Sequence, residues 1–226
     1  ARALQKRRAG FARFAEALAQ HWETALQENE ALNAWLEAGR YARSQFDRVE
    51  SYRVYGRGLD MVMKAPTLFP ENVVYELINE YGNYAFDRDD MVTCEKIYRS
   101  CLEIGEINQN RKLIGTAYNG LARAAFFRNE FEEARTCLER ASWFLEGTDL
   151  RVEQIKTLYV QGTIQYSVDD FTASRRSMEN ALALTENVDD LYINDTKIDI
   201  LTILCADLCY IGEPLTALEY AKQMVN

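Results

Sequence analysis

Few residues in this chain of 226 have the types and spacing that catalysis or metal binding requires. The single histidine, His21, excludes any metal site that needs two imidazoles. The segment DRDDMVTCEKIY, residues 87–98, starts like a calcium loop, but it lacks the central glycine and ends in Tyr98 where a glutamate is needed. The segment YGRGLDM, residues 55–61, lacks the third glycine and the preceding strand of a dinucleotide-binding loop. We therefore expect no catalytic residue, no metal and no cofactor.

Asparagines have a spacing that suits binding rather than catalysis. Asn79 and Asn119 lie 40 residues apart, and Asn83 lies one helical turn beyond Asn79. An asparagine amide offers both a donor and an acceptor, which match the N–H and C=O groups of an extended peptide. A row of such amides can hold a peptide backbone whatever its side chains are. This interpretation requires helices that recur about every 40 residues.

The sequence contains such a repeat in its central part. The residues Met91, Phe131 and Phe171 occupy one repeated position, and residues 94, 134 and 174 a second, small one. The same spacing relates large residues at 98, 138 and 178, and small residues at 101, 141 and 181. Small residues at 82, 122 and 162 lie on the first helix of each unit, twelve positions before residues 94, 134 and 174, and residues 39 and 205 extend this series weakly outwards.

Each repeat is typical of two helices joined by a tight turn. The segments DRDD, RNE, SVDD and IGEP carry the turn signals, and the loop between the last two repeats is predicted at residues 186–195. Small residues on both helices permit close packing, with a large residue of one helix beside a small residue of the other. The segment RNEFEEARTCLERA, residues 128–141, should therefore pack on a helix at about 112–127. Only three prolines and eleven glycines occur, which favours an all-α chain.

This pattern resembles the tetratricopeptide repeat family, in its long-helix variant with repeats of about 40 residues. The resemblance implies an α-solenoid, a right-handed superhelix of about five repeats over residues 28–226. Residues 1–27 predict one more helix, with an apolar stripe made of Leu4, Phe11, Phe14, Leu18, Trp22 and Ala25. This helix packs on the first repeat as a cap or as half of a truncated pair.

In such a stack the first helix of each repeat lines a concave groove. Peptide-binding members of the family grip the ligand backbone with asparagines at these places. Arginines could receive a carboxylate, and aromatic residues could form apolar pockets. The predicted peptide-binding residues are Asn79, Asn83, Asn119, Arg123, Phe126, Tyr159, Tyr166, Arg40 and Arg43.

Charge and cysteine usage limit the class of partner. The formal net charge is −9, and the first fourteen residues carry five basic side chains and no acid, so the rest carries −14 (−9 − 5). An acidic body repels a phosphate backbone, so we expect no direct nucleic-acid binding. Five cysteines in irregular spacing indicate reduced thiols, used as small apolar residues in a cytoplasmic protein. No apolar run reaches the length of about 18 to 20 residues that a membrane span needs.

These observations predict a non-enzymatic scaffold that holds an extended peptide or partner segment in its groove. An alternative is a regulatory or sensor arm of a larger bacterial transcription or signalling regulator, because the basic start could be a linker from a missing domain. A solvated face is the other interpretation of that start. Self-association into a homo-oligomer is a third option.

Overall fold

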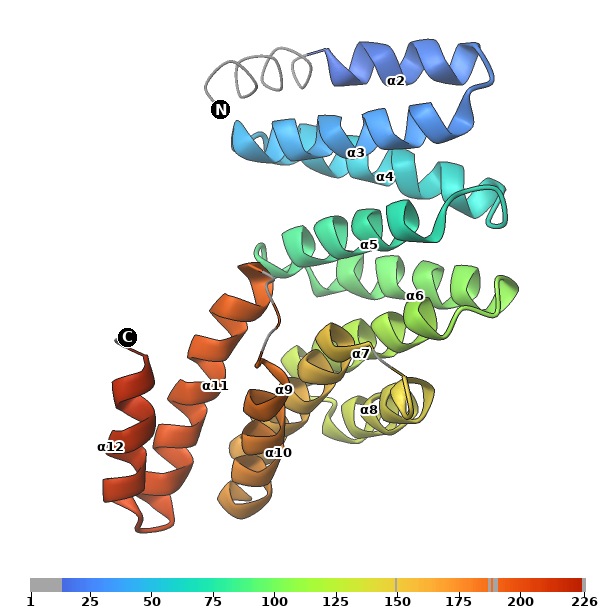
Figure 1. Ribbon diagram of the computed structural model, residues 1–226. Helices are drawn as coiled ribbons and strands as arrows, with labels where there is room; N and C mark the ends of the chain where they lie inside the picture. Colours follow the sequence, from blue (N-terminus) through green and yellow to red (C-terminus); the bar gives the residue numbers. More distant parts are fainter. Residues whose placement is uncertain (1–13, 149, 187, 189–190, 225–226) are drawn as a thin grey trace. The chain divides into compact units, whose positions relative to one another are not determined.

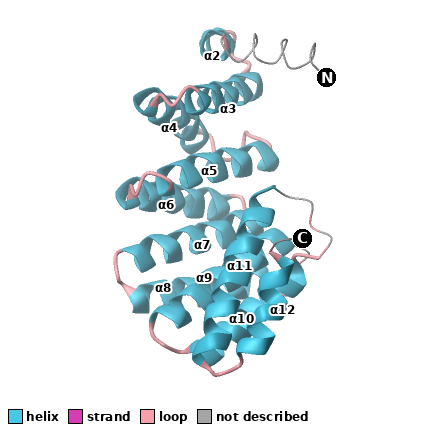
Figure 2. Cartoon of the chain, turned by 90° about the vertical axis from the view of Figure 1, so that its left-hand side faces the viewer, coloured by secondary structure: helices cyan, strands magenta, loops and turns pink. Residues whose placement is uncertain are grey.

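The computed structural model describes residues 14–148, 150–186, 188 and 191–224. Every regular element in these residues is an α-helix, and they contain no strand (Figures 1 and 2). The predicted all-α class is therefore confirmed. The helices are α2 (Ala15–Thr24), α3 (Glu28–Ser44), α4 (Arg48–Lys64), α5 (Glu71–Phe86), α6 (Met91–Ile107), α7 (Arg111–Phe127), α8 (Phe131–Leu145), α9 (Arg151–Ser167), α10 (Phe171–Leu184), α11 (Leu191–Tyr210) and α12 (Pro214–Gln223).

The chain forms two compact units, residues 1–110 and residues 111–226. In unit 1, α3 packs on α4, and α5 packs on α6. In unit 2, the pairs are α7 with α8, α9 with α10, and α11 with α12. We call the first helix of each pair the leading helix and the second the trailing helix. Leading helices also contact the next leading helix within each unit, which is the stacking of an α-solenoid.

Three of the helix pairs are closed by a large side chain that lies over a glycine. A Cβ atom on Gly82 would collide with the Tyr98 ring, and a Cβ on Gly162 would lie 2.7 Å from Met178 Cε. Gly39 has the same relation to the Tyr55 ring in unit 1. In every case the large residue comes sixteen positions after the glycine, from 39 to 55, 82 to 98 and 162 to 178. The predicted packing of small against large residues is therefore confirmed.

The turn inside each repeat has a recurring backbone conformation. One residue per turn has a positive φ, seven positions after the small residue of its leading helix. These residues are Phe46 (58°), Asp89 (54°), Asn129 (61°), Asp169 (62°) and Gly212 (84°). An acidic residue follows each of them, and the carboxylates of Asp47, Asp90 and Asp170 accept a hydrogen bond from the backbone N–H three residues later. This shared turn sets the angle at which each trailing helix returns.

The core of unit 1 includes the described part of the N-terminal helix. Ala15 and Ala19 of α2 are fully buried against α3 residues such as Trp35. Glu23 also fixes α2, because its Oε1 accepts from Trp35 Nε1 at 2.5 Å and its Oε2 pairs with Arg57 Nη2 at 2.6 Å. Of the predicted stripe, Leu18 and Trp22 pack against this core, whereas Phe14 is 61% exposed and Ala25 is also exposed. Leu4 and Phe11 lie outside the described residues.

The core of unit 2 joins α9, α10 and α11. Ile155, Met178 and Ile200 are fully buried in it, and Ile193 is 1% exposed. The predicted loop at residues 186–195 is wrong in its second half, because α11 already begins at Leu191. Ile193 gains burial as part of that helix, which explains the earlier start.

The cysteines mostly fill close helix contacts. Cys94, Cys101 and Cys137 are buried, and Cys94 Sγ lies 3.9 Å from the backbone oxygen of Gly82. The predicted use of cysteine as a small apolar residue is confirmed for these three.

Candidate partner-binding site

The arginines of the predicted site lie on α3 and are held by acidic side chains of α5. Arg40 Nη2 lies 3.1 Å from Glu76 Oε2, and Arg40 Nε lies 3.4 Å from Glu80 Oε1. Arg43 Nη1 lies 3.3 Å from Glu80 Oε2, and its Nη2 lies 3.4 Å from Asp87 Oδ2. The chain's own carboxylates already neutralise both guanidinium groups. This argues against their predicted role of receiving a ligand carboxylate.

The pKa of Arg40 reflects this network. Burial alone lowers the pKa of the guanidinium. The hydrogen bond to Glu37, the charge of Glu80 and the hydrogen bond to Glu76 raise the pKa, and together they outweigh the effect of burial. The net pKa is therefore raised, and the side chain remains a cation at any physiological pH. Arg40 acts as a fixed charge that joins two leading helices of unit 1.

The two asparagines of α5 keep part of their surface exposed. Asn79 Nδ2 donates to the backbone oxygen of Tyr75 at 3.1 Å, one turn earlier in the same helix. Asn83 is also half-buried. Both residues stay within the predicted peptide-binding face of unit 1.

Asn119 of α7 has a different environment, since only 3% of its surface is exposed. Its Nδ2 donates to the backbone oxygen of Glu153 at 3.1 Å, and Thr157 Oγ1 donates to its Oδ1 at 2.8 Å. Both partners lie on α9, the next leading helix. The prediction that Asn119 grips a ligand is therefore wrong. Its amide instead satisfies buried polar groups where two leading helices meet.

Sequence reasoning also missed Glu153, a buried acid in the same network. The residue is 1% exposed, and its Oε1 pairs with Lys156 Nζ at 3.0 Å. A helical pattern gives no signal for such a residue, because an acid in the first turn of a helix is usually solvated.

The other predicted residues of unit 2 are half-buried on the leading helices. The hydroxyl of Tyr159 donates to Asp199 Oδ2 at 3.5 Å, again a contact from one leading helix to the next. Arg123 lies on α7, and its side chain is partly exposed. The face that sequence analysis assigned to a ligand is thus used in large part to join neighbouring repeats.

Aromatic side chains gather where the leading helices of unit 2 end. Tyr166 and Phe171 have ring centroids 5.7 Å apart, and Phe171 stacks on Tyr210 at 4.4 Å with an interplanar angle of 7°. We call these three residues the aromatic cluster. Tyr210 is 65% exposed. Desolvation, followed by the neighbouring Tyr210, raises the pKa of Tyr166, so its hydroxyl stays neutral at pH 7. Phe126 forms a second contact of this kind with Phe131, at 6.0 Å.

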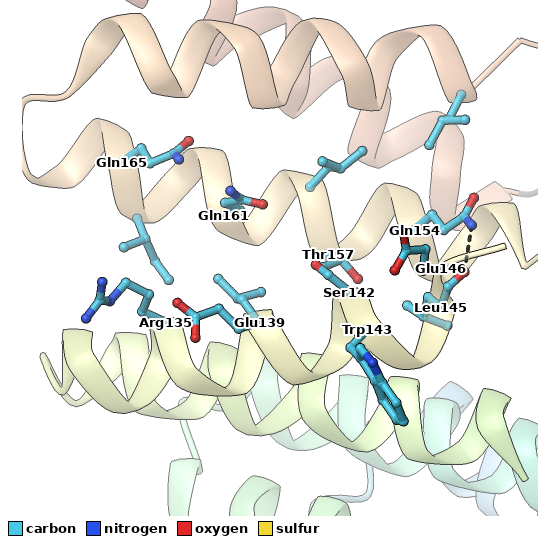
Figure 3. Close-up of a pocket in the computed structure, with 14 residues that line it drawn as sticks. Arg135, Glu139, Ser142, Trp143, Leu145, Glu146, Gln154, Thr157, Gln161 and Gln165 are labelled. Atoms are coloured by element: carbon cyan, nitrogen blue, oxygen red, sulfur yellow. Dashed lines mark hydrogen bonds between the residues drawn. The ribbon is translucent and has the colours of Figure 1, made fainter. Parts of the chain in front are cut away.

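A cleft of about 760 Å³ lies on the other side of α9, between α8, α9 and the end of α10 (Figure 3). Gln161 and Gln165 follow one another along α9, with Arg135 and Glu139 of α8 across from them (Figure 3). Gln161 is two residues from Tyr159, which places it about 200° around the helix. Sequence analysis missed this cleft because it considered only the groove face of each leading helix. The sequence signal that could have indicated the cleft is the helical spacing of Gln154, Leu158, Gln161 and Gln165 along α9.

The described residues provide no group of three or more histidine, cysteine, aspartate or glutamate side chains that could hold a metal ion. Within the same residues, no helix has the length and apolar character needed to cross a bilayer.

The fold and these surfaces define an all-α helical-repeat protein. No family model matches the chain, and no curated protein sequence matches it. The chain is similar in structure to the crystal structure of BtubC (BKLC) from P. vanneervenii, with a TM-score of 0.74 and 16% sequence identity. The alignment covers 98% of this chain and 89% of that chain. At this identity the likeness shows the fold alone, so membership of the tetratricopeptide repeat family stays a prediction.

Proposed function

We propose that the chain is a non-enzymatic scaffold of tetratricopeptide-like repeats that binds an extended segment of a partner protein. The segment lies along the leading helices of unit 2, where it contacts the aromatic cluster. The observation that carries this proposal is the exposure of aromatic rings at the ends of the leading helices: Tyr210, which stacks on Phe171, is 65% exposed, and Phe127 is 56% exposed.

Aromatic rings suit this role because they bury a large area at low cost in side-chain entropy. Tyrosine and tryptophan are accordingly enriched among the few residues that dominate binding energy at interfaces. The cluster is also held in place before binding, since Phe171 of α10 stacks directly on Tyr210 of α11. Preorganisation of this kind lowers the cost of ordering side chains on association.

The amides and arginines contribute less to this proposal than the sequence suggested. Asn119 is buried, and Arg40 is paired within unit 1. The apolar part of the predicted site, Phe126 and Tyr166, is therefore the part on which binding depends.

The proposal is tested by selecting peptides from a random phage-displayed library on the wild-type chain. Each selected peptide is then titrated against the double variant Tyr166→Ser/Tyr210→Ser by fluorescence anisotropy. Loss of two interface aromatics should weaken binding at least about tenfold. Phe46→Ser removes an aromatic that is 84% exposed in unit 1 and should leave affinity within about twofold. A library that yields no binder, or peptides that bind the double variant equally well, would refute the proposal.

A further inference from the structure

We infer that the cleft between α8 and α9 is a second binding site, which takes a short extended peptide with alternating apolar and basic side chains. This site lies on the face of α9 opposite to Tyr159, and it does not depend on the function proposed above. Its occupant follows from the length, lining and charge of the cleft.

The length of the cleft fits a pentapeptide. Its lining runs from Arg135 to Glu146 on α8 and from Gln154 to Gln165 on α9. Eleven residue steps along a helix cover about 16 Å, and five residues of an extended strand cover about the same distance. An extended backbone also keeps its N–H and C=O groups available to a side chain of the cleft, whereas those of a helix are bonded to one another.

The floor of the cleft is apolar with one available amide. Leu138, Leu158 and Ile164 line it, and the half-buried Gln161 stands between them. The side-chain amide of Gln161 makes no hydrogen bond to the described part of the chain. Its side chain therefore offers a donor and an acceptor, the pair that one residue of a peptide backbone requires. Apolar side chains of the peptide would cover the floor while the backbone pairs with this amide.

The rim of the cleft on α8 is negatively charged. Glu139 and Glu146 are exposed there, and neither carboxylate forms an ion pair among the described residues, although the charge of Arg135 also acts on Glu139. The one basic residue of the lining, Arg135, is already paired with Glu132 at 2.6 Å. Side chains alternate along an extended strand, so a peptide with apolar residues toward the floor turns its other residues toward this rim. Basic side chains at those positions complement the two carboxylates.

The probe is a fluorescein-labelled peptide with the sequence Leu-Lys-Leu-Lys-Leu, titrated with the wild-type chain by fluorescence anisotropy at low salt. Peptides of sequence Leu-Glu-Leu-Glu-Leu and Ser-Lys-Ser-Lys-Ser serve as controls for charge and for apolar contact. We expect binding of the first peptide alone. Absence of binding up to about 1 mM, which corresponds to a binding free energy of about −4 kcal/mol, would overturn the inference, and so would equal binding of either control.

Variants then locate the bound peptide. Ser142→Trp places a ring in the cleft from an exposed position of α8, and Glu139→Lys/Glu146→Lys reverses the charge of the rim. Each should weaken binding at least about tenfold. Glu133→Lys, an exposed acid of α8 outside the cleft, should leave affinity within about twofold.

The same titrations keep the two proposals apart. Binding that survives Ser142→Trp but is lost on mutation of the aromatic cluster would place this peptide on the leading helices. That result would overturn the cleft inference and support the function proposed above. Loss of binding in the cleft variants alone supports the cleft, whatever the phage selection yields.

Discussion

Replacing Asp207 by asparagine should stabilise the folded chain at neutral pH and have much less effect near pH 4. Asp207 lies on α11, and none of its surface is exposed. Ser174 Oγ donates to its Oδ2 at 2.8 Å, whereas its Oδ1 has no hydrogen-bond partner among the described residues. Burial therefore raises the pKa of this carboxyl from 3.8 to about 6, and the hydrogen bond from Ser174 opposes that rise only in part.

The magnitude follows from linkage between protonation and folding. Below about pH 4 the carboxyl is largely protonated in both states, and no penalty arises. Between pH 4 and 6 the unfolded chain releases this proton while the folded chain retains it, so stability falls as pH rises. Above pH 6 the penalty is complete, and at 1.36 kcal/mol per pKa unit it amounts to about 3 kcal/mol. Asparagine cannot ionise, and its amide oxygen still accepts from Ser174.

The assay is urea denaturation followed by circular dichroism at pH 4 and pH 7.5. The gain in unfolding free energy of Asp207→Asn over wild type should be about 2 to 3 kcal/mol at pH 7.5 and below about 1 kcal/mol at pH 4. Asp199→Asn removes an exposed carboxylate of the same helix and keeps an oxygen that accepts from the Tyr159 hydroxyl, so it serves as the matched control, with little change at either pH. A loss of stability at pH 7.5, or an equal gain at both values, would show that the buried carboxylate is not what weakens α11.

Four other substitutions test the packing and the turns. Gly82→Ala should lower the unfolding free energy by about 2 kcal/mol, because its Cβ collides with the Tyr98 ring. In Gly56→Ala the new Cβ meets nothing nearer than 3.6 Å, so the higher helix propensity of alanine should raise the unfolding free energy by about 0.5 to 1 kcal/mol. The urea midpoints of these two glycine variants test both expectations. Asn119→Ala should cost about 2 kcal/mol through buried groups left unpaired, a loss visible in thermal melts. Phe46→Gly should gain about 1 kcal/mol, since its φ of 58° strains a side chain that is 84% exposed; an unchanged midpoint would contradict this.

The fold could be predicted because its determinants are local and repeated. Gly82 and Gly162 each indicate a close contact between two helices, and the large residue sixteen positions later packs against the glycine. The positive φ at the turns was not predicted, since residues as different as Phe46 and Gly212 adopt it. That conformation belongs to the end of the leading helix itself, where the N–H of the next residue bonds the carbonyl five positions earlier, as Asp47 N does to Ala42 O at 3.1 Å and Glu213 N does to Leu208 O at 2.7 Å. The division into units at residue 110 likewise left no mark in composition.

The site was predicted less well, because a polar residue on a leading helix has two candidate partners. One is a ligand, and the other is the next leading helix. The prediction considered only the ligand, although Arg40 has Glu80 forty residues later and Asn119 has Thr157 thirty-eight residues later. The cleft was not predicted for a related reason. Its walls come from both α8 and α9, and the sequence pattern of one helix does not indicate a cleft between two.

A physical criterion for similar chains follows from these contacts. A buried or half-buried polar group must find a partner, so complementary residue types one repeat apart indicate a bond between repeats rather than a ligand site. Arg40 and Glu80 satisfy this criterion, and so do Tyr159 and Asp199, whose hydroxyl and carboxylate are 3.5 Å apart. Phe126 and the residue forty positions later, Tyr166, have no such pair of polar groups to exchange. Groove positions such as Phe126 and Tyr166 form no polar bond between repeats. Their exposed apolar area is what a partner segment would bury.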